Sequence, residues 1–247
     1  MRFARNRLGM VLVVAVAVVA IMAIRVVYRT HRTRVAVGRI EAAGGSAQIK
    51  AYYPTWLPSN TFPGIVYDAF KNSSYSVQFA KIAATDADLA PIADLPELRW
   101  LELHTTSVDG IGLSAIAKQK SLRRVFLNHN PIRDDGLAAL SGLHRLEWLE
   151  LGATNVTGEG LRHLSGLRNL ERLGLVNARI SDEGLAHLLP LTRLSRLELY
   201  GTDVSDAGVP ILVQMKGLKD LDLGETQVTD AGAAALQEAL PMCKIVR

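Results

Sequence analysis

The stretch LEWLELGATNVTGEGLRHL, residues 146–164, returns in altered form twice further along the chain. It recurs as LERLGLVNARISDEGLAHL at 170–188 and as LSRLELYGTDVSDAGVPIL at 194–212, shifted by 24 residues each time. A catalytic motif has no reason to recur at a fixed interval, whereas a structural unit that stacks on copies of itself does. The repeat therefore has to be explained as structure before any residue in it is assigned a function.

From residue 85 the register is strict. Six units of 24 residues cover 85–228, and a partial seventh covers 229–247. One apolar column holds Leu101, Val125, Leu149, Leu173, Leu197, Leu221 and Ile245. Two residues further on stands a second column of Leu103, Leu127, Leu151, Leu175, Leu199 and Leu223, and Val77 and Phe79 extend the two columns toward the N-terminus.

Each unit has two halves with different periodicity. The alternation in LEWLEL predicts a short strand with one buried face. The half typified by SDEGLAHLLPL predicts a short helix with a polar start, for which Ser181, Ser205 and Thr229 are natural N-caps. No unit can bury its leucines alone, so we predict a parallel sheet with one strand per repeat and a continuous core. The fold class is therefore α/β, a solenoid with strands on its concave face and short helices on its convex face.

The pattern L-x-x-L-x-L-x-x-[TN]-x-[VI] resembles the leucine-rich repeat, and the start [ST]-D-x-G-L-x-x-L resembles its ribonuclease-inhibitor-like class. The layout, including RVAVGRIEAAGG at 34–45, is similar to a bacterial membrane-anchored family of such proteins. This resemblance implies a curved solenoid that binds a partner and has no enzymatic activity. The usual asparagine column, whose side chains satisfy backbone groups after the strand, holds Thr106, Asn130, Thr154, Ala178, Thr202 and Thr226 here. Ala178 lacks a polar side chain and marks a weak point.

Charge is unevenly distributed along the chain. Residues 1–50 carry nine basic side chains and one acidic one, whereas residues 51–247 carry 19 basic and 23 acidic ones. The basic net charge therefore belongs to the N-terminal segment, and the mildly acidic remainder argues against a nucleic-acid-binding surface. The single cysteine, Cys243, excludes an intramolecular disulfide and a cysteine-based metal cluster, and we interpret it as a buried core residue.

The N-terminal segment predicts a membrane anchor. Leu8–Ile24 contains 17 residues without a charge, which span about 25 Å as a helix. Extension to Tyr28 approaches the ~30 Å of a bilayer core. A cleaved signal peptide is the alternative, but no small-residue cleavage site precedes RVVYRTHRTR. We therefore expect a single-pass protein spanning the membrane through residues 8–28. Arginines on both sides of the span leave its orientation open.

Three domains follow from these patterns. Residues 1–45 form the anchor and a juxtamembrane helix stopped by Gly44 and Gly45, residues 46–84 an N-terminal cap, and residues 85–247 the repeats. The segments SAQIKAYY and YSVQF predict strands within the cap.

Motifs that suggest enzymatic or metal chemistry are better explained by the repeat. The recurring aspartates fit helix capping and the helix dipole rather than a metal ladder. His163 and His187 share a helical column without a third ligand, which favours plain convex-side histidines over a zinc site. No phosphate-binding loop or nucleophile elbow is present in the sequence. We predict no catalytic residue, metal, cofactor, nucleic acid or small-molecule substrate.

The outward positions of the strands are the ones that repetition does not explain. Their aromatic and arginine content is typical of binding hot spots. The alternative is an arginine–glutamate ladder between strands, with the aromatic rings covering leucines. The predicted protein-binding residues on the concave face are Trp100, Glu102, His104, Arg124, Phe126, Trp148, Glu150, Arg172, Arg196, Glu198 and Tyr200. We expect Trp100 and Trp148 to lie about 10 Å apart, two strands from each other, with Arg124 between them.

The sequence thus favours a membrane-tethered protein-binding module. Two alternatives stay open: a structural envelope component that assembles through the solenoid, and a secreted binding protein if the N-terminal segment is cleaved. The partner, the side of the membrane and the biological process are not encoded in any motif.

Overall fold

The structure is a computed structural model that describes residues 31–52, 72–80, 84–95 and 97–247. Side chains are described for 31–47, 84–95 and 97–247. The expected membrane span, residues 8–28, lies outside these ranges. Within them, no helix combines the length and the hydropathy that crossing a bilayer requires.

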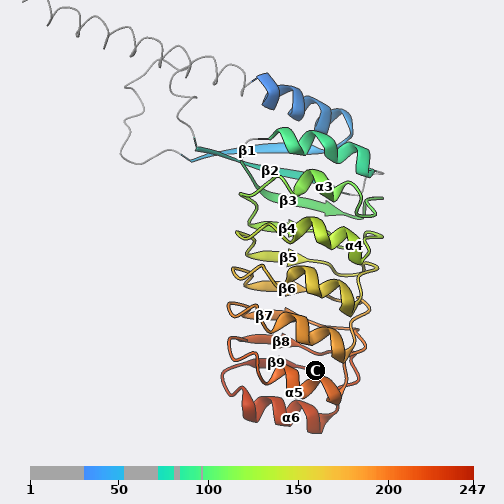
Figure 1. Cartoon of the computed structure of the whole chain (residues 1–247), viewed down its shortest axis with the longest axis vertical. Coiled ribbons are helices and arrows are strands. Elements are labelled where there is room, and N and C mark those ends of the chain that lie inside the picture. Colours follow the sequence, from blue (N-terminus) through green and yellow to red (C-terminus); the bar gives the residue numbers. More distant parts are fainter. Residues whose placement is uncertain (1–30, 53–71, 81–83, 96) are drawn as a thin grey trace, which may run out of the picture.

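In the described part of the chain, nine strands form one sheet and follow each other in chain order (Figure 1). The first two pair antiparallel, and every later pair is parallel. The strands are β1 (Ser46–Tyr52), β2 (Asn72–Ala80), β3 (Leu98–His104), β4 (Arg124–Phe126), β5 (Trp148–Glu150), β6 (Arg172–Gly174), β7 (Arg196–Glu198), β8 (Asp220–Asp222) and β9 (Lys244–Val246). The predicted parallel sheet with one strand per repeat is confirmed.

The register of the sheet equals the 24-residue repeat. Leu149 of β5 pairs with Val125 of β4 on one side and with Leu173 of β6 on the other. The same register continues into β2, where Val77 pairs with Leu101 and Phe79 with Leu103. Residues 24 apart in sequence therefore lie side by side on neighbouring strands. Every column read from the sequence is a line along the solenoid axis.

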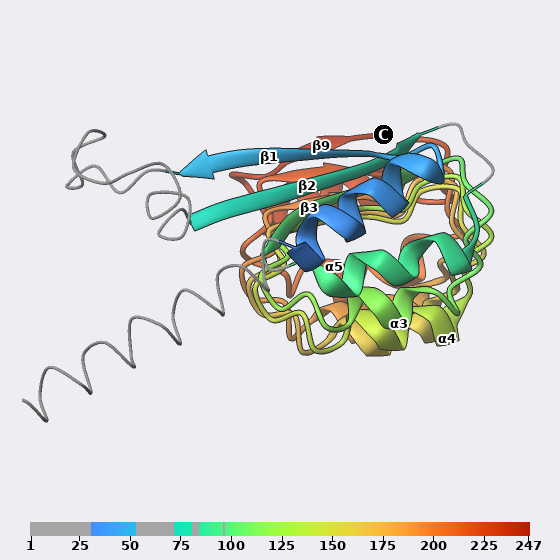
Figure 2. The same ribbon diagram turned by 90° about the horizontal axis from the view of Figure 1, so that it is seen from above.

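The helical half of each repeat lies opposite the sheet, as the view along the stack shows (Figure 2). These helices are short, and several have 3-10 geometry, because each coil offers only one or two turns before the chain returns to the next strand. The helices are η1 (Asp86–Asp94), α3 (Leu113–Ile116), α4 (Asp134–Leu137), η2 (Ala138–Leu140), η3 (Gly158–Leu164), η4 (Asp182–Leu188), η5 (Asp206–Gly208), α5 (Val209–Leu212) and α6 (Asp230–Ala239).

The core is a continuous rod of leucine between sheet and helices. Leu149 and Leu151 of one coil and Leu173 and Leu175 of the next are all 0% exposed. Each such side chain contributes roughly 1.5–3 kcal/mol through burial, and only the neighbouring coil makes that burial complete.

The asparagine column behaves as expected. The hydroxyls of Thr154 and Thr202 each donate to the carbonyl of the strand leucine three residues earlier, at 2.7 Å. The Asn130 amide donates to the carbonyl of Leu127 at 2.9 Å. Ala178 offers only its backbone N–H, which bonds the Leu175 carbonyl at 3.0 Å. The repeat at Ala178 therefore lacks one buried hydrogen bond that its neighbours have.

A helix over residues 31–42 covers the N-terminal end of the stack (Figures 1 and 2). Ala36 and Ile40 on its inner side are 2% and 0% exposed and join the leucine core. The predicted stop is confirmed, since the N–H of Gly44 bonds the Glu41 carbonyl and the N–H of Gly45 bonds the Ile40 carbonyl, both at 2.9 Å. Gly44 adopts a left-handed φ of 81°, which completes this Schellman end. The helix thus covers the solenoid end in addition to the expected cap.

Candidate functional site

The repeated aspartates form an aspartate ladder that ties neighbouring coils together. The Asp182 carboxylate accepts from the backbone N–H of Ser205 at 2.8 Å and from its hydroxyl at 2.6 Å. Asp134 accepts the same pair of hydrogen bonds from Thr157, and Asp206 accepts it from Thr229. The ladder is defined as Asp134, Asp182 and Asp206. Each carboxylate thus bonds one coil further along, which is a stronger structural role than complementing the dipole of its own helix.

The repeated glycines make room for this ladder. A Cβ atom on Gly208 would lie 2.5 Å from an Asp182 carboxylate oxygen, and one on Gly160 would lie 2.3 Å from Asp134 Oδ1. The aspartate and the glycine of the motif [ST]-D-x-G therefore act together. The aspartate accepts hydrogen bonds from the next coil, and the glycine of that next coil leaves space for the carboxylate.

The helix N-caps differ from coil to coil. Ser205 and Thr229 accept from the N–H groups of Ala207 and Gly232 as predicted. The Ser181 hydroxyl instead donates to the Glu183 carboxylate and makes no cap bond. The predicted cap bond at Ser181 is therefore wrong for this helix.

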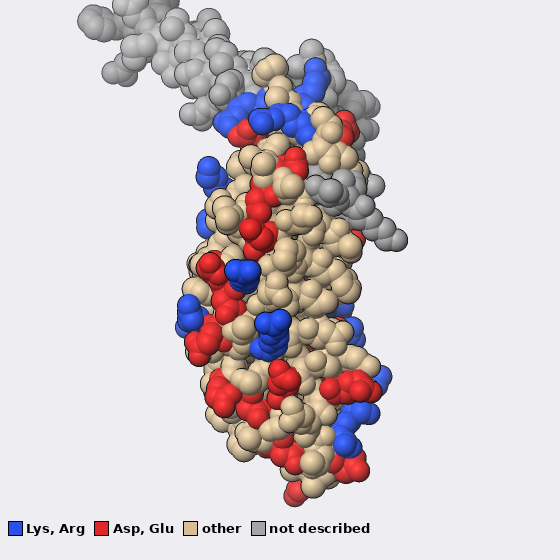
Figure 3. Space-filling model, turned by 90° about the vertical axis from the view of Figure 1, so that its right-hand side faces the viewer, with Lys and Arg blue, Asp and Glu red and all other residues tan. Residues whose placement is uncertain are grey.

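Figure 3 views the edge at the carboxyl ends of the strands, where acidic side chains run along much of the solenoid. Among the described residues, no group of three or more histidine, cysteine, aspartate or glutamate side chains is arranged to hold a metal ion. The acidic residues of the aspartate ladder are explained by coil-to-coil bonding.

The strand face carries a different kind of cluster. Phe126 stacks against Trp100 with ring centroids 5.5 Å apart and meets Trp148 at 5.0 Å with the planes tilted by 60°. These rings come from β3, β4 and β5, which the repeat register places side by side. We define the aromatic–arginine patch as Trp100, Arg124, Phe126, Trp148 and Arg172.

The arginines of this patch lie on the tryptophan rings. The Arg124 guanidinium carbon is 5.2 Å from the Trp100 ring centroid and 5.7 Å from that of Trp148, and that of Arg172 is 4.7 Å from Trp148. These distances are within the range of cation–π attraction. The expected placement of Arg124 between the two tryptophans is confirmed.

Both arginines are solvent-exposed. Within the part of the chain that the structure describes, neither side chain makes a hydrogen bond or an ion pair. Both guanidinium groups lie over tryptophan rings, which leaves their N–H donors without a partner among the described residues.

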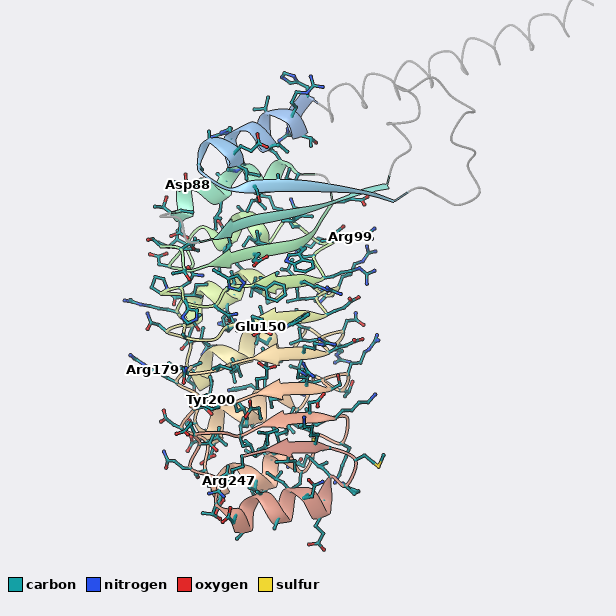
Figure 4. All side chains as sticks on the ribbon, turned by 180° about the vertical axis from the view of Figure 1, so that it is seen from behind. Asp88, Arg99, Glu150, Arg179, Tyr200 and Arg247 are labelled. Atoms are coloured by element: carbon teal, nitrogen blue, oxygen red, sulfur yellow. The ribbon has the colours of Figure 1, made fainter. Side chains whose placement is uncertain are left out.

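Glu150 borders the patch near the middle of the strand face (Figure 4). Burial and the nearby Glu198 carboxylate raise the pKa of Glu150, while the hydrogen bond from the Trp148 indole and the charges of Arg196 and Arg172 oppose that rise. Gly174 on the next strand leaves the space that the carboxylate fills, since a Cβ there would overlap a Glu150 oxygen. This role of Gly174 was not foreseen from the sequence; a glycine among large outward residues was the available signal.

The other predicted site residues lie outside the patch. Glu102 and His104, both on β3, lie 3.1 Å apart, and the His104 ring also meets that of Phe126 at 5.9 Å. Arg196 pairs with Asp220 of the next strand at 3.2 Å, as an arginine–acid ladder between strands would have it. Tyr200, 39% exposed, makes no ring contact with another described aromatic residue and lies over Gly224 near the end of its strand (Figure 4). The predicted set therefore divides into two parts. One is the aromatic–arginine patch, and the other, which we call the paired half, contains the ion-paired Arg196 together with Glu198 and Tyr200.

Two recesses were not foreseen from the sequence. One of about 150 Å³ lies on the paired half of the strand face, lined by Arg196, Glu198, Asp220, Asp222 and Lys244 among others. A larger one of about 460 Å³ lies on the helix side and includes Asp109, Gly110, Ile111, Arg133 and Asp135. Both mix opposite charges, so neither selects a ligand of one sign.

Comparison with known proteins agrees with this architecture. The family model described as "Leucine Rich repeat" matches residues 118–141 and 217–236. No curated protein sequence matches the chain.

Two solved structures from Listeria monocytogenes are similar in fold. The internalin inlF is 23% identical with a TM-score of 0.54, and the match covers 64% of this chain and 43% of that one. The internalin C2, inlC2, is 24% identical with a TM-score of 0.53, covering 67% of this chain and 74% of that one. The chain thus spans less than half of the first protein's length. Repeat sequence and fold together identify a leucine-rich repeat protein.

Proposed function

Because the chain is a leucine-rich repeat solenoid, we propose that it is a protein-binding module whose site is the strand face around the aromatic–arginine patch. The observation that carries the proposal is the arrangement of Trp100, Phe126 and Trp148 as one partly exposed aromatic row with Arg124 held between the tryptophans. Aromatic rings and arginines dominate the energetics of protein interfaces.

The rigidity of the strands beneath the patch supports the same proposal. The patch stands on parallel strands whose leucines are fully buried beneath it, so its side chains are held before a partner arrives. Side chains that are already ordered lose little conformational entropy on binding. The proposal includes no catalytic role. It includes a tether: residues 8–28 hold the solenoid at a membrane as a single-pass anchor, supported by the 17 uncharged residues of Leu8–Ile24.

Affinity capture from membranes tests the binding role. The full-length tagged chain is compared with the Trp100→Ala/Trp148→Ala variant, and His163→Ala/His187→Ala on the helix side serves as the matched control. We expect the tryptophan variant to lose the captured proteins and the histidine variant to keep them. Equal capture by all three folded chains would remove the site from the strand face.

Membrane tethering is tested separately. The full chain should resist alkaline extraction from membranes and keep its N-terminal residues. A mature N-terminus between about residues 25 and 45 would instead indicate a cleaved signal peptide.

A further inference from the structure

The aromatic–arginine patch contains two guanidinium groups that lie over tryptophan rings and make no hydrogen bond to a described residue. Arg124 lies between Trp100 and Trp148, and Arg172 lies on the far side of Trp148. Neither makes an ion pair within the described chain, in contrast to Arg196 with Asp220 or Arg193 with Glu171. A guanidinium that lies over an aromatic ring can still donate its N–H groups to a carboxylate in bidentate geometry.

The carboxylates around the patch are already engaged. Glu150 accepts from the Trp148 indole, and Glu102 pairs with His104. These contacts direct both carboxylates toward neighbours on the sheet. The charged side chains of the patch itself are two arginines, Arg124 and Arg172, two strands apart, roughly 10 Å.

We propose that the aromatic–arginine patch binds a short acidic segment of a partner protein, with two carboxylates bonded to Arg124 and Arg172 and an apolar group on the aromatic row. The inference rests on the proposed protein-binding function and names its partner class. A long polyanion such as nucleic acid fits less well, because residues 51–247 carry more acidic than basic side chains and would repel it beyond the patch. A short segment contacts only the locally positive surface.

Glu150 provides a second test of the proposal, because changing it should affect the binding of an acidic segment in the opposite direction to changing the arginines. Glu150 pairs in register with Gly174 of β6, the strand that carries Arg172, and the Arg172 charge favours its ionised form. It therefore offsets part of the positive charge that an acidic ligand uses. Neutralising it should strengthen the binding of an acidic segment and weaken the binding of a basic one.

The test uses the full-length chain in detergent and fluorescent peptides in which two glutamates are separated by one to five residues around a single phenylalanine. Matched peptides carry glutamine or lysine in place of both glutamates, and a single-stranded oligonucleotide is included. Affinity is measured by anisotropy at two salt concentrations. The variants are Arg124→Gln/Arg172→Gln, Glu150→Gln and, as a control with the same change in charge, Arg168→Gln/Arg179→Gln.

We expect at least one glutamate spacing to bind the unaltered chain about tenfold more tightly than its glutamine counterpart, with affinity falling as salt rises. The Arg124→Gln/Arg172→Gln variant should lose this preference, Glu150→Gln should bind more tightly, and the control should be unchanged. Melting curves of each variant exclude unfolding as the cause.

Other outcomes overturn the inference. Preference for lysine peptides, weaker binding by Glu150→Gln, tighter binding of the oligonucleotide, or absence of peptide binding would each do so. Binding that depends on Trp100 and Trp148 but not on glutamate would also overturn it while leaving the proposed function intact, whereas loss of the proposed function is seen in the capture experiment.

Discussion

The aspartate ladder and the aromatic–arginine patch are built from the same 24-residue unit, yet they use their polar groups in opposite ways. In the ladder, each carboxylate bonds the next coil, as Asp182 does with Ser205 at 2.6 and 2.8 Å. In the patch, Arg124 and Arg172 rest on aromatic faces and bond no described residue. The ladder recurs along the stack and the patch occurs at one place. Repetition therefore identifies the residues that hold coils together, and its interruption identifies the residues available to a partner.

Removing the N-terminal cap should have the largest effect, because it breaks the stack on which both regions depend. A chain that begins at residue 85 loses β2, which pairs with β3, and the helix over 31–42. Loss of Ile40 burial alone removes about 1.5–3 kcal/mol of stabilisation. We expect aggregation or a clearly lower thermal midpoint than for a chain beginning at residue 31. Equal midpoints would show that residues 31–84 do not cap the solenoid.

A single change in the aspartate ladder should have the next largest effect. Asp182→Ala leaves the N–H and the hydroxyl of Ser205 without their acceptor, which costs about 1–3 kcal/mol of unfolding free energy. The matched control is Asp203→Ala, since Asp203 is exposed and makes no such bond. Urea unfolding of both variants decides the point. A similar loss at Asp203 would mean that the ladder bonds are not what the measurement reports.

Ala178→Thr should act in the stabilising direction. A threonine hydroxyl at this position can donate to the Leu175 carbonyl, as Thr154 and Thr202 do to their own strand leucines at 2.7 Å. One added buried hydrogen bond contributes about 0.5–1.5 kcal/mol. A lower denaturation midpoint would show instead that the coil around Ala178, which is 3% exposed, has no room for the larger side chain.

The contributions of the two regions to folding stability should change with pH in opposite directions, and this is the smallest effect we predict. Hydrogen bonds from Thr229 lower the pKa of Asp206, so the stability this carboxylate adds is present above its unfolded pKa and is lost as pH falls. Burial raises the pKa of Glu150, so folding favours its protonated form and stability is lost as pH rises through the folded value.

The matched variants are Asp206→Asn and Glu150→Gln, followed by thermal melting from about pH 3 to 7 across the ordinary carboxyl range. Asp206→Asn should be less stable than the unaltered chain at neutral pH. Glu150→Gln should be at least as stable there. In both cases the difference should shrink in acid, and a difference of the same sign for both variants would contradict the assignment.

Much of the fold was predictable because stacking imposes the same buried atoms on every coil. The leucine columns, the sheet register and the stop at Gly44 follow from residue type alone, and the structure confirms them. The bonding of the aspartate ladder was not predicted, because its two ends lie 23 residues apart and only the folded path brings them together.

A second feature had no consistent sequence signal. The turn after each strand holds a left-handed residue, including Thr105, Ala153 and Asn177 at φ of 52–55°. In this column Gly201, at φ 67°, and Asn177 are residue types that adopt this conformation readily, whereas Thr105 and Ala153 are not. The packing of the repeat holds these residues in the left-handed conformation whatever their type, so residue type alone does not reveal the conformation.

The candidate site was predictable as a set of outward positions but not as a cluster. Register placed Trp100, Arg124 and Trp148 on adjacent strands, and the structure brings their side chains together. Register did not separate Tyr200 and Arg196 from them, because side-chain direction and the pairing of Arg196 with Asp220 depend on local contacts.

The central claim is that the strand face, not the helix side, meets the partner. Site-specific photo-crosslinking in the full chain on its own membranes tests it most directly, with the crosslinker placed at Phe126 in one chain and at His187 in another. We predict protein adducts from position 126 that disappear with Trp100→Ala, and none from position 187. Adducts from position 187 alone, or from both positions regardless of Trp100, would contradict the claim.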